Sequence, residues 1–497
     1  MSTIPKIAFL LLIVNLLYGQ EKANIQIINS DFTYFDQKRF PDIRRLVGNV
    51  KFEHKGALMS CDSAWYFFND NRFKAFNNVK INQGDSIFLN GNRLSYDGKT
   101  KQAIINDDIS LKDKNMFLTT DQLNYSLETN IASYNFGANI VNGDNTLTSK
   151  KGKYLSDTKF LIFKDSVVLI NPSYIIECDT LHFHSTKEIA YFYGPTTIKS
   201  NENLIYCENG WYNTLTDLSQ YNKNAFLNNG QQTLSGDSMF YDRNKGYGIA
   251  INNVEILDTI NKYTIYGHKA EYFERSDSSI ITDTPLLISE LDDDSLFLHS
   301  DTIVANLDSQ NYRQINAFTG VKFFSQNLQG KCLELFYFMR DSSIHMFNSP
   351  VLWTTDYQLT SEHMVLYLKD ERLERLEMQK DAFITSKDSL DLYNQIKGKN
   401  TIGFFRNNDL HKLFIDGNGQ ATYVIKDEFE KVSGVNTVSC SQMTVYIKKK
   451  EIDKISFQNQ PNAVIYPFED LPLKWKRLDG FINRFSERIL DKNSIWN

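Results

Sequence analysis

The residues with most capacity for chemistry in this chain are five cysteines, which lie far apart. They are Cys61, Cys178, Cys207, Cys332 and Cys440. Small secreted scaffolds held by disulfides carry a dense set of cysteines in a short chain, so five in 497 residues do not form such a framework. Three of the five, Cys61, Cys178 and Cys207, occupy one column of an internal repeat, which favours buried small residues over a disulfide or metal site. Only the pair Cys178 and Cys207 is worth testing for a bond.

Two other groups could bind metal ions. His182 and His184 stand two apart, on one face of a predicted strand, but the spacing suggests no third ligand, and a zinc site needs three or four. Asp292, Asp293 and Asp294 could bind Ca²⁺, although such a run usually marks an exposed loop. No nucleophile elbow, phosphate loop or zinc-type helix is present. We therefore expect no catalytic residue, no metal site and no cofactor.

Composition points to an all-β chain. Proline is scarce at 9 residues and aromatic residues reach 13%. Proline is excluded from central strands, whereas tyrosine, phenylalanine, valine and isoleucine suit a pleated, half-buried surface. The net charge of -6, without a strong basic block, argues against nucleic acid as a partner, because binding phosphates needs clustered lysine and arginine.

A repeat of about 29 residues runs through most of the chain. Its first column is a small residue followed by a mostly polar one, and the members lie 29 to 33 positions apart: Cys61-Asp62, Gly91-Asn92, Thr120-Asp121, Ser149-Lys150, Cys178-Asp179, Cys207-Glu208, Gly236-Asp237, Gly267-His268, Ser300-Asp301, Gly330-Lys331 and Ser361-Glu362. An aromatic residue follows each of the first eight small residues by five positions, but Ala305 and Leu335 then take that place. A period of this length indicates stacked structural repeats.

A second column has the same period: Asn49-Val50, Asn78-Val79, Asp108-Ile109, Asn139-Ile140, Ser166-Val167, Asn253-Val254, Gly320-Val321 and Pro350-Val351. Polar turns recur about every 15 residues, leaving segments long enough for one strand each, and short turns can only join antiparallel neighbours. The small-residue column falls in mid-strand, where we expect a sharp bend that lets each strand cross between two facing sheets. We expect the acidic residue after the bend to form strand-end hydrogen bonds. A parallel β-helix is the alternative fold.

One strand face carries an apolar and aromatic ladder. Its members are Leu94, Tyr96, Leu123, Tyr125, Leu181, Phe183, Met239 and Tyr241. Since they share a face, they line the seam between the two predicted sheets. If the seam is closed, they are its core. If it is open, they form a groove that shields acyl chains from water, so they are the candidate lipid-binding residues.

Both ends of the chain differ from the repeat. Residues 1–20 have Lys6 before the apolar run Ile7 to Val14, which is too short for a membrane-spanning helix and is typical of a secretory signal peptide. Near the other end, Trp475, Leu478, Phe481, Ile482, Phe485 and Ile489 recur at helical spacing with basic residues between them. This pattern predicts a short amphipathic helix that caps the last strand or docks on a membrane surface or partner.

The motifs Gly48-Asn49-Val50-Lys51-Phe52, Ser60-Cys61-Asp62-Ser63 with Tyr66, and Ala75 to Ile81 resemble the OstA-like family. This family includes the lipopolysaccharide-transport bridge LptA and the N-terminal domain of LptD. The resemblance is clearest from about 45 to 275. It implies a twisted β-jelly roll whose interior carries the acyl chains of lipopolysaccharide and whose ends pair edge to edge with other jelly-roll transport components. The chain is longer than the bridge protein and lacks a counterpart to LptD's C-terminal barrel.

The sequence thus predicts an all-β protein with an elongated, repetitive antiparallel β-jelly roll and a short C-terminal helix. We expect a signal peptide over 1–20, the jelly roll over 21–275, less regular β repeats over 276–460 and a tail with the helix over 461–497. The expected function is a lipopolysaccharide-binding bridge that is periplasmic, with association to the outer membrane left open, and that takes part in lipopolysaccharide transport. A structural or adhesive cell-surface rod and a carbohydrate-active β-helix enzyme are the alternatives.

Overall fold

The structure is a computed structural model. It describes residues 24–83, 87–113, 116–201, 203–290, 294–370, 372–388, 392–406, 409–427, 429, 431–448 and 451–496. The predicted signal peptide lies outside these residues. The chain divides into two compact units, Met1–Thr186 and Lys187–Asn497, here called unit 1 and unit 2.

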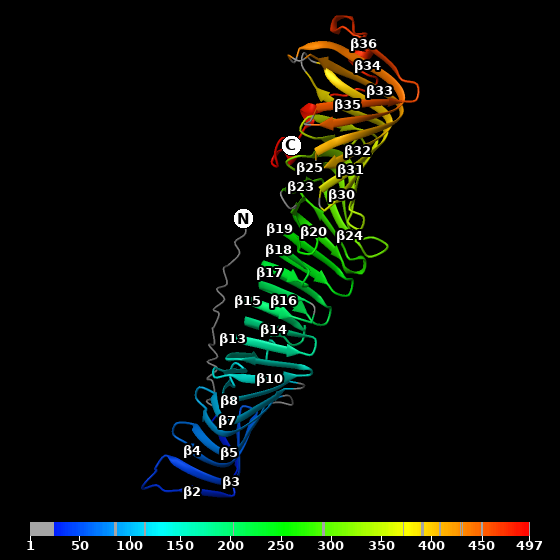
Figure 1. Ribbon diagram of the computed structural model, residues 1–497. Helices are drawn as coiled ribbons and strands as arrows, with labels where there is room; N and C mark the ends of the chain where they lie inside the picture. Colours follow the sequence, from blue (N-terminus) through cyan, green and yellow to red (C-terminus); the bar gives the residue numbers. More distant parts are fainter. Residues whose placement is uncertain are drawn as a thin grey trace, which may run out of the picture. The chain divides into compact units, whose positions relative to one another are not determined.

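Unit 1 consists of antiparallel strands that follow one another in chain order (Figure 1). They are β1 (Gln26–Asn29), β2 (Phe32–Phe35), β3 (Ile43–His54), β4 (Ala57–Phe67), β5 (Arg72–Gln83), β6 (Ile87–Asp97), β7 (Gln102–Asp113), β8 (Met116–Ser126), β9 (Ile131–Tyr134), β10 (Ala138–Asn142), β11 (Asn145–Ser149), β12 (Lys151–Leu155), β13 (Phe160–Asn171) and β14 (Tyr174–His184).

Unit 2 continues the pattern with strands that are first regular, then split in two, and finally long. They are β15 (Ile189–Lys199), β16 (Leu204–Asn213), β17 (Leu218–Asn228), β18 (Gln232–Asp242), β19 (Tyr247–Asp258), β20 (Tyr263–Phe273), β21 (Ser278–Thr282), β22 (Leu286–Glu290), β23 (Ser295–His299), β24 (Thr302–Leu307), β25 (Arg313–Phe324), β26 (Gln329–Phe338), β27 (Ser343–Phe347), β28 (Val351–Trp353), β29 (Tyr357–Thr360), β30 (His363–Lys369), β31 (Arg372–Lys387), β32 (Tyr393–Arg406), β33 (Asp409–Lys426), β34 (Val432–Lys448), β35 (Glu451–Gln458) and β36 (Asn462–Tyr466).

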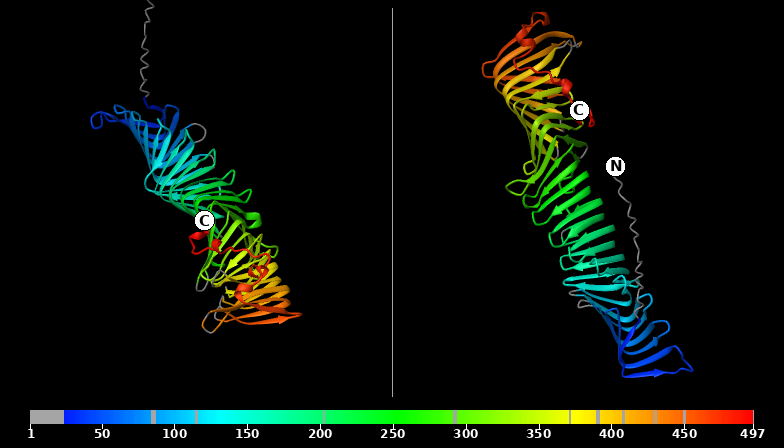
Figure 2. Two further views of the ribbon diagram at one scale, coloured as in Figure 1. Left: turned by 90° about the horizontal axis from the view of Figure 1, so that it is seen from above. Right: turned by 180° about the vertical axis from the view of Figure 1, so that it is seen from behind.

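Each full-length strand contributes to two half-sheets. In β3, Ile43–Val47 pairs with the second half of β4, and Val50–His54 pairs with its first half, with a register shift between them. We call the half-sheet that contains Ile43–Val47 half-sheet A and the one that contains Val50–His54 half-sheet B, and we use the same names for the corresponding half-strands in both units. The turns at the free ends of A and B form the two lips of a mouth, and the seam lies between the facing half-sheets (Figure 2).

The register shift is a β-bulge built from residues with left-handed backbone. In β3 these are Gly48, at φ 81°, and Asn49, at φ 45°. Asparagine, aspartate and glycine tolerate this conformation best, and a bulge bends the strand that carries it. The same feature recurs at Asn77–Asn78, Asp107–Asp108, Asp165–Ser166, Lys223–Asn224, Asn252–Asn253, Asp283–Thr284, Thr319–Gly320, Asn348–Ser349, Lys380–Asp381, Gly417–Asn418 and Asn459–Gln460.

The bend therefore lies at the second sequence column, and not in the small-residue column where we expected it. The small residue lies on the neighbouring strand, opposite the residue that follows the bulge, as Cys61 does opposite Val50. It is small because the inside of the bend is crowded. A Cβ on Gly91 would lie 2.5 Å from Cγ2 of Ile105, closer than Cβ atoms approach other atoms.

The polar residue after the small one clamps the next bulge. The side chain of Asn78 donates to the Asp62 carboxylate at 2.7 Å, and that of Asn253 donates to Asp237 at 2.9 Å. The predicted strand-end role is wrong, because these bonds lie in mid-strand across the bend. They stabilise the left-handed bulge residue through its own side chain.

The all-β antiparallel jelly roll is confirmed. All pairings between the strands of the described residues are antiparallel, so the parallel β-helix is wrong. The short C-terminal helix is present as a single turn, α1 (Leu473–Lys476). The helical spacing up to Ile489 does not continue as a helix: α1 is followed by extended chain with the 3-10 turns η3 (Phe485–Glu487) and η4 (Ser494–Trp496). In the described part of the chain, no helix has the length and apolar character needed to cross a membrane.

Candidate functional site: the seam between the half-sheets

The predicted ladder lies on half-sheet A and faces the seam. In unit 1, Leu94, Tyr96, Leu123, Tyr125 and Leu181 are buried, and Phe183 is half-buried. In unit 2, Met239 is buried and Tyr241 is half-buried. Burial raises the pKa of the Tyr125 hydroxyl to about 12. The alternation of strand residues thus places the ladder as expected, within each unit.

In unit 1 two tyrosines of half-sheet A, the ladder residue Tyr96 and Tyr154, reach across the mouth. The hydroxyl of Tyr96, on half-sheet A, lies 2.6 Å from Nδ1 of His54, at the free end of half-sheet B. Farther along unit 1, the hydroxyl of Tyr154 on half-sheet A donates to the carboxylate of Asp113 at the free end of half-sheet B, at 2.5 Å. Burial raises the pKa of both tyrosine hydroxyls, so they remain protonated. These two bonds hold the lips of unit 1 together.

Part of the seam of unit 1 is nearly filled. The void lined by Leu111, Leu118, Leu123, Tyr154 and other seam residues has a volume of about 10 Å³. One water molecule needs about this much room, so an acyl chain does not fit at this place unless the half-sheets separate. There the ladder residue Leu123 is part of the core.

Unit 2 contains a large apolar cavity in its seam. It has a volume of about 570 Å³, within the range of small-molecule sites. Both half-sheets contribute equally to its deepest wall: Ile315, Leu335 and Leu366 from half-sheet A, and Leu287, Leu298 and Phe323 from half-sheet B. The wall is therefore hydrocarbon on both sides.

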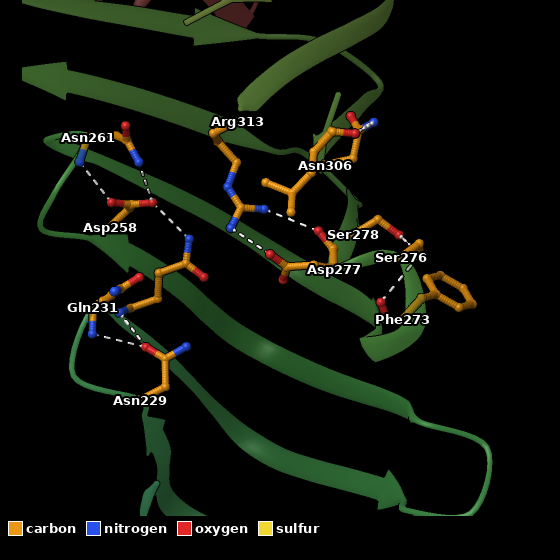
Figure 3. A network of polar contacts seen from close by, with 12 residues as sticks. Asn229, Gln231, Asp258, Asn261, Phe273, Ser276, Asp277, Ser278, Asn306 and Arg313 are labelled. Carbon is orange, nitrogen blue, oxygen red and sulfur yellow. Dashed lines mark hydrogen bonds and ion pairs between the residues drawn. The ribbon is translucent and has the colours of Figure 1, made fainter. Parts of the chain in front are cut away.

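Polar side chains from both half-sheets gather around Tyr263, which lines the cavity. Arg313, on half-sheet A, forms an ion pair with Asp277 of the same half-sheet at 3.1 Å. On half-sheet B, the Asp258 carboxylate accepts bonds from Asn261 and Gln232, and the net effect of these bonds is to lower its pKa despite burial (Figure 3). Lys262, Asp294 and Arg372 line the cavity itself. Arg313 and Asp277 of half-sheet A interact electrostatically with the Tyr263 hydroxyl of half-sheet B.

The cysteines do not form a reactive site. All five are buried free thiols, so Cys178 and Cys207 are not bonded. Burial raises the pKa of Cys61 and Cys332 to about 12 and that of Cys207 to about 11, which keeps these thiols protonated and unreactive.

The possible metal ligands are placed as follows. His182 and His184 lie on β14, and the ring of His184 packs against Phe160. Asp292 and Asp293 lie outside the described residues, while Asp294 accepts a bond from the backbone of Gln326. Among the described residues, no group of three potential ligands is arranged for a metal ion.

Sequence reasoning missed the cavity in unit 2, because its walls come from residues 260–373, where the repeat loses its register. One signal was visible: the aromatic column is interrupted by Ala305 and Leu335, and Leu335 lines the cavity.

A comparison with known protein families shows which family the chain is related to. A family described as OstA-like protein matches residues 22–179 and 174–293, more than half of the chain. The chain belongs to the OstA-like protein family. The match ends at residue 293, so it includes the seam of unit 1 and only one side of the cavity in unit 2.

Other comparisons add little. No curated protein matches the chain. Among solved structures, it is similar to LptH from Pseudomonas aeruginosa, the LptA homologous periplasmic component of the conserved lipopolysaccharide transport device in that organism. That match has 12% sequence identity and a TM-score of 0.21, and it covers 22% of this chain and 81% of LptH.

Proposed function

We propose that this protein is a periplasmic bridge that binds lipopolysaccharide through its acyl chains and takes part in lipopolysaccharide transport and outer-membrane assembly. Family membership supports the transport role. The cavity of about 570 Å³ between the half-sheets of unit 2 is the observation that carries the binding role. Periplasmic location rests on the signal-like pattern of residues 1–20.

The chemistry of the cavity fits a hydrocarbon ligand with a polar head. Each methylene moved from water into apolar surroundings contributes about 0.8 kcal/mol. The aliphatic wall supplies that environment, and the charged lining of the cavity has both signs, with Lys262 and Arg372 beside Glu290, Asp294 and Asp370. A chain of this kind would enter from the mouth with its head remaining at the rim.

The ladder of unit 1 is part of the same proposal. The candidate contacts for acyl chains are Leu94, Tyr96, Leu123, Tyr125, Leu181 and Phe183, together with Met239 and Tyr241 in unit 2. In unit 1 the lips must first separate, which breaks the bonds of Tyr96 to His54 and of Tyr154 to Asp113. These bonds would then act as latches on lipid entry.

Edge strands offer the means of bridging. In unit 1, β1 and β2 pair side by side with the two halves of β3, and Phe32, Tyr34 and Phe35 of β2 are exposed. In unit 2, β35 and β36 pair in the same way with β34. Unpaired backbone groups of such strands can pair with an edge strand of another jelly roll.

Site-specific photocrosslinking in cells tests the binding role. A benzophenone amino acid would replace Tyr337, which lines the cavity, or Tyr312, which is 50% exposed in a nearby turn, as the matched control. We expect a lipopolysaccharide adduct at Tyr337 and none at Tyr312. No adduct at Tyr337, or equal adducts at both positions, would show that the cavity does not hold this lipid.

Localisation separates the bridge from an adhesive surface rod. Protease added to intact cells should leave a periplasmic protein whole and should degrade a surface rod. Depletion should reduce the amount of lipopolysaccharide that reaches the cell surface, and an unchanged amount would contradict the transport role even if the adduct forms.

A further inference from the structure

The C-terminal tail, residues 471–496, is an extended strap on the outer face of half-sheet B in unit 2. Figure 2 shows it in red beside the strands of that unit. A row of buried glutamines holds its main chain. The Gln395 side chain donates to the carbonyl of Lys476 at 3.0 Å and accepts from the amide of Leu478 at 2.9 Å. The Gln358 side chain donates to the carbonyl of Ile482 and accepts from the amide of Arg484, both at 2.7 Å.

Side chains on one side of the strap anchor it to the sheet. They are Leu471, Leu478, Ile489 and Ile495, and all four are buried. Arg488 adds a bond from Nε to Gln329 at 2.9 Å, and Glu487 forms ion pairs with Arg484 and Lys331. The strap is thus fixed in one conformation, and its opposite side faces solvent.

That opposite side is unusually apolar. Leu473 is 82% exposed, Ile482 63% and Leu490 78%. Single exposed hydrophobic residues are common on protein surfaces, but here three large ones belong to one segment, which the contacts described above hold against the sheet.

The strap is also basic in an acidic chain. Residues 471–496 include six basic and three acidic residues, whereas the whole chain has a net charge of -6. Lys474, Lys476 and Lys492 form no ion pair within the described part of the chain; each lies near an aromatic ring instead, at 5.9, 5.9 and 5.6 Å from the ring centroid. Their charges are therefore available to an anionic partner.

We propose that the solvent side of the strap is a docking surface for an anionic lipid bilayer. Exposed leucine and isoleucine side chains with lysines between them match an interface of acyl chains below anionic headgroups. The glutamine row keeps the strap ordered before contact, so docking does not require the segment to fold. This surface lies on the outer face of the sheet and does not involve the cavity.

Vesicle co-sedimentation of the purified full chain tests the proposal. The probes are vesicles of phosphatidylcholine alone and vesicles of phosphatidylcholine with phosphatidylglycerol. We expect binding to the anionic vesicles that weakens as salt is added. Equal binding to both kinds of vesicle, or no binding to the anionic ones, would overturn the proposal.

Two sets of variants assign the binding to the strap. Leu473→Ser, Ile482→Ser and Leu490→Ser together should lower the partition coefficient at least about tenfold, because three apolar contacts are lost. Phe136→Ser, Leu215→Ser and Phe429→Ser are the matched control, since these residues are exposed by 75%, 71% and 75%. All six positions face solvent, so the fold should be retained. Equal losses in both sets would overturn the proposal.

The charge test follows the same design. Lys474→Gln, Lys476→Gln and Lys492→Gln should each lower binding to anionic vesicles about fivefold, and the matched changes at the exposed Lys55, Lys99 and Lys223 should have little effect. Crosslinking from Tyr337 in the cavity should be unchanged by all of these variants. Failure of vesicle docking therefore leaves the proposed lipid site standing, and the reverse is also true.

Discussion

Replacing Gly267 with alanine should destabilise the strands beside the cavity, whereas the same replacement at Gly236 should be tolerated. Both glycines belong to the small-residue column, and both lie in unit 2 on neighbouring repeats. Neither has the left-handed backbone that would penalise any side chain. The two substitutions therefore differ only in the space available to the new methyl group.

The magnitude follows from that space. A Cβ on Gly267 would lie 2.6 Å from Cγ2 of Ile281 and 3.2 Å from the carbonyl oxygen of Thr282, and Ile281 is fully buried. At Gly236 the nearest atom, Cβ of Ala250, is 3.5 Å away, which is an ordinary contact. Overpacking lowers the free energy of unfolding by about 1–3 kcal/mol. Replacing glycine also reduces the conformational freedom of the unfolded chain, which raises the free energy of unfolding by about 0.4–1 kcal/mol. We expect a net loss of about 1–2 kcal/mol at Gly267 and a neutral or slightly stabilising effect at Gly236.

Native-state hydrogen exchange is the suitable assay. A chain with two units and stacked repeats does not unfold in a single two-state step, so one global midpoint would not report the local change. Opening free energies of amides in β20, β21 and β22 should fall in Gly267→Ala and remain unchanged in Gly236→Ala. Equal effects of the two substitutions would refute the explanation of the small-residue column by crowding inside the bend.

Three further predictions concern single contacts. Tyr96→Phe removes the bond to His54 across the mouth and should lower the opening free energy of amides in β3 and β6 by about 1–3 kcal/mol in native-state hydrogen exchange, whereas Tyr34→Phe, on an exposed residue, should be silent. Gln358→Leu leaves the Ile482 carbonyl and the Arg484 amide without the bonds it makes, so limited proteolysis should cut the strap faster, and the exposed Gln37→Leu should not change the rate. Arg484 and Lys331 lower the pKa of Glu487 to about 2, below its value of about 4.3 in an unfolded chain. Its contribution to holding the strap is therefore complete above about pH 4.3 and is lost as the pH falls toward 2, so hydrogen exchange of the strap, corrected for its intrinsic pH dependence, should rise over that range in the native protein and stay flat in Glu487→Gln.

Much of the fold could be predicted because strand alternation and turn spacing are local properties of the sequence. The ladder residues Leu94, Tyr96, Leu123 and Tyr125 face the seam because a period of two fixes the face. The antiparallel order follows from turns too short for a crossover. These two facts determine the half-sheets once the strands are known to bend.

The chemistry of the bend was harder to predict. The small-residue column is visible because it is crowded, but the left-handed bulge at Gly48–Asn49 and its equivalents lies on the adjoining strand. Asparagine and aspartate at the second column were the signal, since these residues tolerate positive φ. Their side-chain partners, such as Asp62 for Asn78, become apparent only when the strand register is known.

The C-terminal tail shows how a pattern with a period of 3.6 can mislead. Apolar residues at helical spacing also occur in an extended strap, in which some side chains pack against the sheet and others face solvent without a regular period. Leu478 and Ile489 are buried while Ile482 is exposed, which a single helical face would not produce. The buried Gln358 and Gln395 offered no local signal, because their partners are more than 80 positions away in the sequence.

The repeat fades in the region that holds the cavity of unit 2. In two repeats of unit 1 the residue five positions after the small one is a tyrosine that reaches the opposite lip, as Tyr96 reaches His54 and Tyr154 reaches Asp113. Unit 2 begins with tyrosines at this position, and Ala305 and then Leu335, which have no hydroxyl and are shorter, replace them only beside the cavity. Neither residue can form a hydroxyl bond like that of Tyr96, and Leu335 lines the cavity. The cavity in which we propose that lipid binds thus lies where the repeat becomes irregular. In the regular repeats of unit 1, lipid could enter only after the bonds of Tyr96 and Tyr154 across the mouth were broken.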